Sequence, residues 1–243
     1  MLRSMFGQPR RKDEGLLAAV NQAITSYLHL LESVPAEERN LQERRYIIWG
    51  RGFLRALDEL EQSQFAAVSY GSKVTKTYID EMSENELDDY HKHLYFYKNA
   101  IIRLFAILDK LGHFMNERFR LKTEEIKGRY SYFTVLRNMH TNHLYTKLEE
   151  QLYDLKIAYK VPVERLRNER NMEIHTINAD LLDDLLQAAE SKQSLDQRKR
   201  TENIQEHLKD LEIGCNMTFM ASEKVFTYIR TLSESSGQYS PSN

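Results

Sequence analysis

One short segment of the chain, residues 163–176, concentrates the side chains best suited to acid–base chemistry. It contains Arg165, Arg167, Arg170, Asn171 and His175. An imidazole titrates near neutral pH, and a guanidinium presents a fixed fork of hydrogen-bond donors. The segment therefore has the residue types for proton transfer beside a stabilised negative charge.

Helix geometry decides which of these side chains can meet. On an α-helix, Arg167, Asn171 and His175 recur every four residues and lie on one face. Arg170 and His175 are five positions apart, which separates their directions by about 140°. They can meet if Arg170 reaches around the helix, if the helix starts inside the segment, or if a second chain supplies one of them.

The elements that position this segment are expected to be helices. The chain has 243 residues, of which 41% are hydrophobic, and only four prolines and nine glycines. A β-protein of this size would need more turns than that. We therefore predict an all-α bundle of about six or seven helices, forming one domain over residues 1–243 with flexible tails at 1–11 and 233–243.

Apolar spacing and helix breakers set the expected helix boundaries. They predict helices over residues 12–33, 42–68, 84–119, 129–160, a shorter one from Val163, one near 180–189 and a last one over 197–232. Ser83 fits an N-cap, because acidic residues follow it. Gly50 and Gly52 weaken the second helix, which allows close packing or a kink. Pro162 is expected to end the 129–160 helix.

Several kinds of site are not expected from the sequence. No glycine-rich phosphate loop and no CxxC pair occurs, so neither a cofactor nor a metal ion is predicted. Asp88 and His91, beside His93, come nearest to a di-iron motif. They lack a symmetric partner and indicate a solvated helix start.

The environment of the chain is expected to be a reducing cytoplasm. Cys215 is the only cysteine and is predicted to be a small buried hydrophobe. No apolar run approaches the length of a membrane span, and the formal net charge is −2. That charge argues against a protein coated with basic residues for duplex DNA.

The string from Arg170 to His175 resembles the signature of the HEPN superfamily. That signature is an Arg, usually followed by a polar residue such as Asn, with four to six residues before a His. The superfamily is all-helical, and its motif lies late in the domain, as Arg170 does here. The chain is most similar to larger HEPN-like proteins of bacteria, of the Cthe-2314-like type, over approximately residues 84–232.

A second copy of the pattern competes with the first. Arg137 and Asn138 are followed by His143, inside the helix predicted to end near residue 160. The copy at Arg170 is favoured, because it follows a helix break and has Arg167 in line. Alternatively, the two motifs lie close together in the fold and form one polar site.

The resemblance implies a mechanism. Many HEPN proteins are metal-independent endoribonucleases whose His and Arg meet across a homodimer interface. His175 would act as general base on a ribose 2′-hydroxyl or as general acid on the leaving oxygen. Arg170 would stabilise the charged transition state, and Asn171 would orient the histidine or the phosphate. The products would be a 2′,3′-cyclic phosphate and a 5′-hydroxyl.

The charge pattern suits single-stranded RNA as the partner. Lys and Arg outnumber Asp and Glu over residues 118–170, and residues 171–190 contain no Lys or Arg. Arg165, Arg167, Arg137 and His143 are the predicted RNA contacts. Glu169 and Glu173, however, bracket Arg170 and can pair with it. The alternative is thus a non-catalytic helical interaction or regulatory protein with a degenerate motif, and whether the protein is an enzyme stays open.

Overall fold

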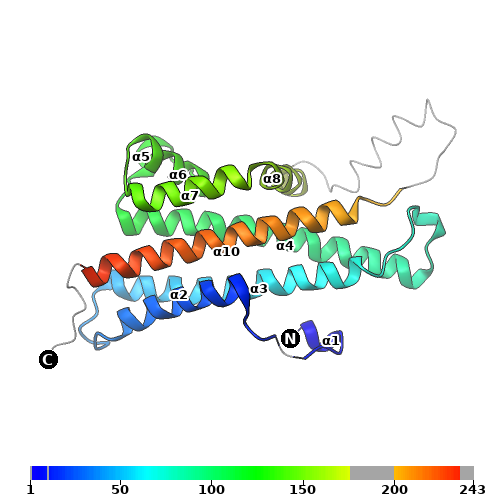
Figure 1. Cartoon of the computed structure of the whole chain (residues 1–243), viewed down its shortest axis with the longest axis horizontal. Coiled ribbons are helices and arrows are strands. Elements are labelled where there is room, and N and C mark those ends of the chain that lie inside the picture. The colour runs from blue at the N-terminus through cyan, green and yellow to red at the C-terminus, as the bar shows by residue number, and fades with distance from the viewer. Residues whose placement is uncertain (1, 10, 176–199, 236–243) are drawn as a thin grey trace. The chain divides into compact units, whose positions relative to one another are not determined.

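The computed structural model describes residues 2–9, 11–175 and 200–235. Within these ranges the chain forms nine α-helices, one 3-10 turn (Ile79–Glu81) and no strand (Figure 1). Two helices are four residues long, α1 (Leu2–Met5) and α5 (Thr123–Ile126). The other seven are α2 (Gly15–Glu32), α3 (Leu41–Gly71), α4 (Glu84–Phe119), α6 (Tyr132–Thr141), α7 (Thr146–Ala158), α8 (Lys160–His175) and α10 (Ile204–Ser235). The prediction of an all-α chain with six or seven helices is confirmed.

The chain divides into two compact units. The first contains Met1–Arg10, Leu60–Arg103 and Lys160–Gly214, and the second contains Arg11–Glu59, Leu104–Tyr159 and Cys215–Asn243. Helices α3, α4 and α10 each contribute residues to both units. The predicted helix near residues 180–189 lies outside the described residues.

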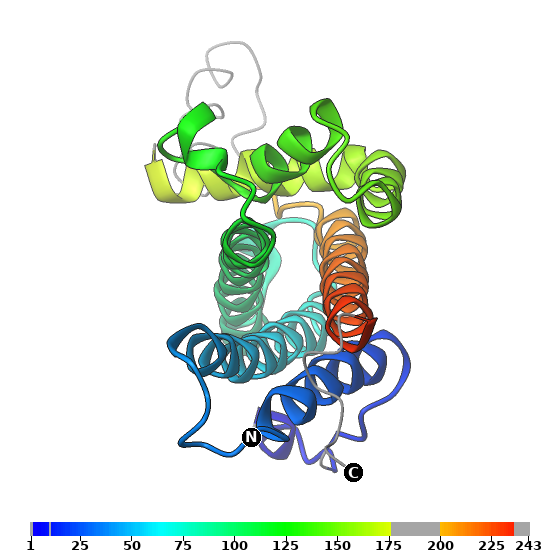
Figure 2. The same cartoon turned by 90° about the vertical axis from the view of Figure 1, so that its left-hand side faces the viewer.

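The second unit is built around buried aromatic rings from four helices. Figure 2 views these helices nearly end on. Tyr27 of α2, Phe53 of α3, Phe114 of α4 and Phe226 of α10 are all buried. The ring centroids of Phe114 and Phe226 are 5.2 Å apart, and Phe226 lies 5.3 Å from Phe53 and 5.7 Å from Tyr27. Such pairs stabilise a core beyond the area that they bury. Cys215 is buried as predicted.

The prediction of one helix over residues 129–160 is wrong. Helix α6 ends at Thr141 and α7 begins at Thr146, and between them His143 and Tyr145 have φ angles of 51° and 52°. This left-handed backbone reverses the chain without glycine or proline, so no breaker marked the turn. The turn is anchored by tertiary contact, because the Tyr145 hydroxyl donates a hydrogen bond to the Phe119 carbonyl over 3.2 Å.

Other helix ends agree with their sequence signals. Helix α4 has the predicted bounds, and the Glu86 N–H donates a hydrogen bond to Ser83 Oγ over 3.2 Å, which confirms the N-cap. Helix α8 begins at Lys160, so Pro162 lies in its first turn rather than before it. A proline is tolerated there, because an N–H in the first turn has no partner inside the helix.

The first unit joins α1, the end of α3 and the start of α4. Arg3, in the segment expected to be a flexible tail, forms an ion pair with Glu61, and its guanidinium lies 4.2 Å from the centre of the Phe65 ring. His93 is fully buried, and its Nδ1 lies 2.8 Å from the Ala67 carbonyl oxygen. The expectation that His93 belongs to a solvated helix start is therefore wrong, because the ring packs against α3.

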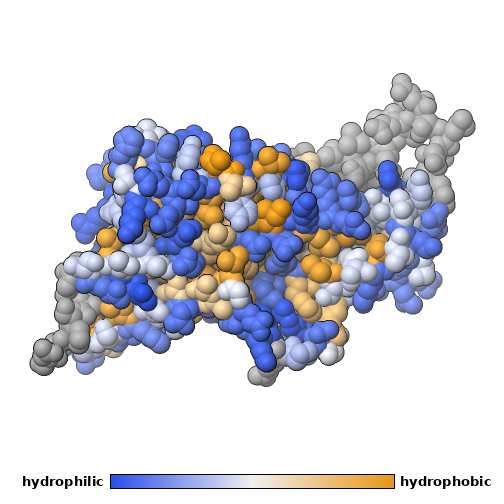
Figure 3. Space-filling view, in the orientation of Figure 1, coloured by the Kyte–Doolittle hydropathy of each residue, from blue (hydrophilic) through white to orange (hydrophobic). Residues whose placement is uncertain are grey.

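No helix in the described ranges combines the length and the apolar character needed to cross a membrane. Hydrophilic side chains cover most of the face seen in Figure 3, with separate apolar patches between them.

Two glycines mark close helix contacts in the second unit. A Cβ added at Gly50 would lie 2.8 Å from Leu28 Cδ2, which confirms close packing, and α3 continues through this position. A Cβ added at Gly112 would lie 2.7 Å from the backbone Cα of Tyr132. Gly52 has open space around it.

We expect Gly112→Ala to lower the free energy of unfolding by about 1–3 kcal/mol, because backbone atoms of α6 must move. Gly52→Ala is the matched control: it should leave stability unchanged or raise it by up to about 1 kcal/mol through helix propensity. Urea unfolding followed by circular dichroism measures both. Equal stability of the two variants would contradict the close approach of α4 and α6.

Candidate functional site

The buried face of α8 changes character halfway along the helix. Val163 and Leu166 are buried at its start. Glu169, Arg170 and Glu173 follow at helical spacing and are half-buried. Charged side chains at positions that continue an apolar face are costly unless they have partners, so such positions often mark a functional site.

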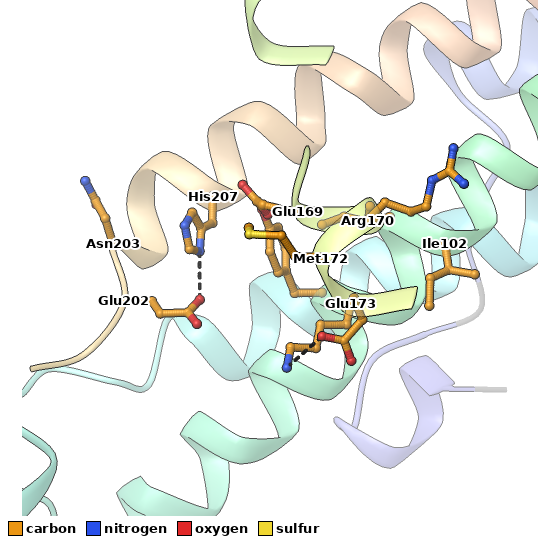
Figure 4. Close-up of a pocket in the computed structure, with 11 residues that line it drawn as sticks. Ile102, Glu169, Arg170, Met172, Glu173, Glu202, Asn203 and His207 are labelled. Atoms are coloured by element: carbon orange, nitrogen blue, oxygen red, sulfur yellow. Dashed lines mark hydrogen bonds and ion pairs between the residues drawn. The ribbon is translucent and has the colours of Figure 1, made fainter. Parts of the chain in front are cut away.

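These charged residues line a pocket of about 200 Å³ in the first unit. Figure 4 shows α8 contributing Glu169, Arg170, Met172 and Glu173. The other lining residues are Tyr97, Lys98, Ile101 and Ile102 from α4, and Glu202, Asn203 and His207 at and just before the start of α10. The pocket thus combines apolar, aromatic and titratable side chains from three parts of the chain.

A hydrogen bond joins α4 to α8 in the lining of this pocket. The Tyr97 hydroxyl donates to Glu169 Oε2 over 2.6 Å. Burial raises the pKa of the Glu169 carboxyl, although the bond from Tyr97 acts in the opposite direction. Burial, and then the charge of Glu169, raise the pKa of Tyr97. Glu169 therefore takes up a proton more readily than an exposed glutamate does.

Two imidazoles stack with Tyr97, and their pKa values are shifted in opposite directions. The ring of His207 lies parallel to Tyr97 at 5.1 Å, and its Nδ1 is 3.2 Å from Glu202 Oε2. Burial alone would lower the pKa of His207, but Glu202 and the charge of Glu169 outweigh burial and raise it. Burial lowers the pKa of His93, whose ring is 5.9 Å from Tyr97. Of the two imidazoles, only His207 lines the pocket.

The motif residues of α8 lie at different places around the helix. Arg170 lines the pocket, and in Figure 4 its side chain extends away from His207. Asn171 is exposed. His175 is the last residue of α8, and its side chain lies outside the described residues. Because α8 is continuous from Lys160, the helix does not start inside the motif, and two of the three ways for Arg170 and His175 to meet remain.

Arg165 and Arg167 stay predicted RNA contacts. Arg165 donates from Nε and Nη2 to the two carboxylate oxygens of Asp210 over 2.5 and 2.6 Å. Because the Asp210 side chain is buried, this pair neutralises a charge inside the unit and ties α8 to α10. Arg167 is half-buried.

The two glutamates that bracket Arg170 have partners on α4. Glu169 accepts the bond from Tyr97, and Glu173 Oε2 lies 3.2 Å from Lys98 Nζ. Pairing of these carboxylates with Arg170 stays a prediction.

The competing motif, Arg137 to His143, belongs to the second unit. Arg137 is exposed on α6, and His143 is exposed in the left-handed turn that follows. Asn138 is buried and donates from Nδ2 to the Leu121 carbonyl and to Thr123 Oγ1, both over 3.0 Å. Asn138 of the competing motif thus has a structural role. A joint polar site of the two motifs stays a prediction.

Sequence reasoning missed the residues that surround Arg170. Tyr97 fits the apolar stripe of its helix and gives no sign of its hydrogen bond. His207 and Glu202 are far from α8 in sequence, so no spacing rule connects them to it. The one available signal was the row of charges that continues the apolar face of α8. In the described ranges, no group of three or more His, Cys, Asp or Glu side chains could hold a metal ion.

The raised pKa of Glu169 gives a prediction for stability. Between the usual pKa of 4.5 and the raised pKa of folded Glu169, the folded protein holds this proton more tightly than the unfolded chain, so the contribution of Glu169 to stability falls as pH rises through this window. Glu169→Gln removes this loss, and its stability relative to wild type should increase with pH by about 1.4 kcal/mol per unit of pKa shift. Urea titrations at several pH values measure it. The exposed control Glu212→Gln should run parallel to wild type, and a parallel Glu169→Gln curve would contradict the prediction.

Comparison with known proteins places the chain in a family. No curated protein and no solved structure gives a significant match to it. The family model of Cthe2314-like HEPN proteins matches residues 49–230, well over half of the chain, and this range includes α8 and the pocket. The chain therefore belongs to the Cthe2314-like HEPN family.

Proposed function

We propose that this protein binds single-stranded RNA and cleaves it without a metal ion, with Arg170, Asn171 and His175 at the centre of the site. The observation that carries the proposal is that Arg170 of the HEPN motif lines a pocket with Tyr97 and His207. Arg170 supplies a guanidinium for a phosphate, and His207 supplies an imidazole that can contact a base in the same pocket.

The proposed reaction uses the 2′-hydroxyl of the RNA as nucleophile. In the first role that the motif allows, His175 takes the hydroxyl proton as the 2′-oxygen attacks the adjacent phosphorus. The bond from phosphorus to the 5′-oxygen breaks and that oxygen takes a proton from water, which leaves a 2′,3′-cyclic phosphate and a 5′-hydroxyl. In the second role, His175 is the general acid that gives the leaving 5′-oxygen its proton. Arg170 stabilises the charge that develops on the phosphate oxygens.

The carboxylates of the pocket suit a base better than a phosphate. Glu202 and Glu169 offer acceptors to the amino groups of a base, while Met172 and Ile102 provide apolar contact. We place the phosphate next to Arg170, on the side away from His207, toward which its side chain extends.

The proposed active form is a homodimer in the cytoplasm. Arg170 and His175 leave a continuous helix about 140° apart. A partner chain that presents its own α8 brings the arginine of one chain to the histidine of the other.

A non-catalytic HEPN protein is the second candidate. It is favoured by the three carboxylates of Glu169, Glu173 and Glu202, which share the pocket with Arg170 and oppose a phosphate there. This candidate predicts RNA or protein binding without cleavage.

Cleavage of labelled single-stranded RNA in EDTA tests the proposal. Wild type should yield products ending in a 2′,3′-cyclic phosphate. Arg170→Ala and His175→Ala should each lose about 10²–10⁴-fold in rate. The control is His91→Ala, a histidine exposed on α4, which should cleave at the wild-type rate. Wild-type protein that neither cleaves nor binds RNA would rule out the proposal, and binding without cleavage would support the second candidate.

A further inference from the structure

The second compact unit has a hollow of its own. It is an open groove of about 720 Å³ between α3, the end of α4 and the loops on either side of α5. Its lining contains Asn116, Glu117 and Glu124 and, beside them, six aromatic and basic side chains: Trp49, Lys110, His113, Arg120, Lys122 and Tyr130. We refer to these six residues as the Trp49 groove.

The loop that carries two of the basic residues has an unusual backbone. Arg120 and Lys122 both have a φ angle of 53°, which costs a non-glycine residue about 1–2 kcal/mol. Buried amides hold this conformation. Asn116 Oδ1 accepts the Thr123 N–H over 2.9 Å, and Asn138 Nδ2 donates to the Leu121 carbonyl over 3.0 Å. Strain of this kind is often stored where a surface is built for binding.

The positive charges of the groove are available for an anionic ligand. In the described part of the chain, Lys110 and Arg120 form no ion pair. Lys122 pairs with Glu125 over 3.0 Å, but both side chains are more than 60% exposed, so the pair is weak. Two carboxylates also line the groove: Glu117 pairs with Arg45 over 2.9 Å, and Glu124 accepts a bond from Asn116 over 2.8 Å, so three cations face two carboxylates there.

The aromatic rings of the groove are fixed in place. Trp49 is half-buried and packs on Phe114, with ring centroids 5.5 Å apart. The Tyr130 hydroxyl accepts a hydrogen bond from Asn116 Nδ2 over 3.0 Å, and its ring lies 4.5 Å from His113. Rigid rings beside flexible cations are the usual composition of a surface on which single-stranded bases stack.

We propose that the Trp49 groove binds a short stretch of single-stranded RNA, with bases stacked on Trp49 and Tyr130 and phosphates at Lys110, Arg120 and Lys122. The choice of RNA rests on the proposed function, but the groove is a separate contact and no cleavage takes place there. An acidic peptide would satisfy the cations and leave the rings unused, so the aromatic lining favours RNA.

The single tryptophan of the chain makes the test direct, because Trp49 lies in the groove itself. Wild-type protein is titrated with a 2′-O-methyl RNA octamer, which has no free 2′-hydroxyl and is not cleaved. Stacking should quench Trp49 fluorescence at saturation. The logarithm of the association constant for the octamer should fall linearly as the logarithm of the salt concentration rises.

Variants separate the groove from general electrostatics. Arg120→Asn/Lys122→Asn removes two charges while keeping residues that tolerate left-handed backbone. Its affinity should fall about tenfold or more, and its salt slope should fall by about 0.7 per charge. Lys127→Asn/Arg129→Asn is the matched control, with the same charge change on exposed residues outside the groove, and should bind within about twofold of wild type. Lys110→Gln, on α4, repeats the test without touching the loop.

The outcomes distinguish this proposal from the proposed function. Quenching that persists in Arg170→Ala supports the groove even if no RNA is cleaved. The proposal is overturned if RNA does not quench Trp49, if both double variants weaken binding equally, or if a glutamate octapeptide quenches as strongly as RNA. Active cleavage together with no quenching would leave the proposed function standing and remove the groove.

Discussion

The directions of the side chains on one unbroken helix limit which residues of the Arg170 motif can act together. Helix α8 runs from Lys160 to His175, and Pro162 in its first turn does not interrupt it. A rigid α-helix fixes the directions of its side chains, so Arg170 and His175 diverge by about 140°. Since a catalytic site requires near-contact between its groups, one helix of this geometry needs either a long reach by Arg170 or a second chain. The homodimer in our proposal is the second of these two solutions.

The first unit has charged side chains at half-buried and buried positions. Leu166 ends the apolar face of α8, and the positions beyond it are held by contacts to other helices. Glu169 is bonded to Tyr97, Glu173 to Lys98, and Arg165 reaches the buried Asp210 of α10. Buried ionic groups seldom add net stability, so an apolar continuation of this face would fold at least as well. Glu169 and Glu173 line the pocket and belong to our proposed binding site, whereas Arg165 and Asp210 tie α8 to α10.

The sequence predicts those parts of the molecule whose signals are local. Ser83 and the acids after it give both the start and the cap of α4, and the few prolines and glycines exclude a β-fold. The turn at residues 142–145 is invisible for the opposite reason: His143 and Tyr145 take left-handed backbone because Tyr145 is anchored to Phe119, a tertiary contact. The same holds for His207, whose place beside Tyr97 depends on how α10 meets α4. Arg170 could be predicted as a candidate because its motif is contiguous in the sequence.

The most direct test of the account asks whether one site takes residues from two chains. Arg170→Ala and His175→Ala proteins are prepared separately, shown to be inactive on single-stranded RNA, then unfolded together and refolded as an equal mixture. If the arginine of one chain works with the histidine of the other, mixed dimers contain one intact site, and the mixture regains about a quarter of wild-type activity. A mixture as inactive as its components, from a wild type that cleaves RNA, would contradict the shared site.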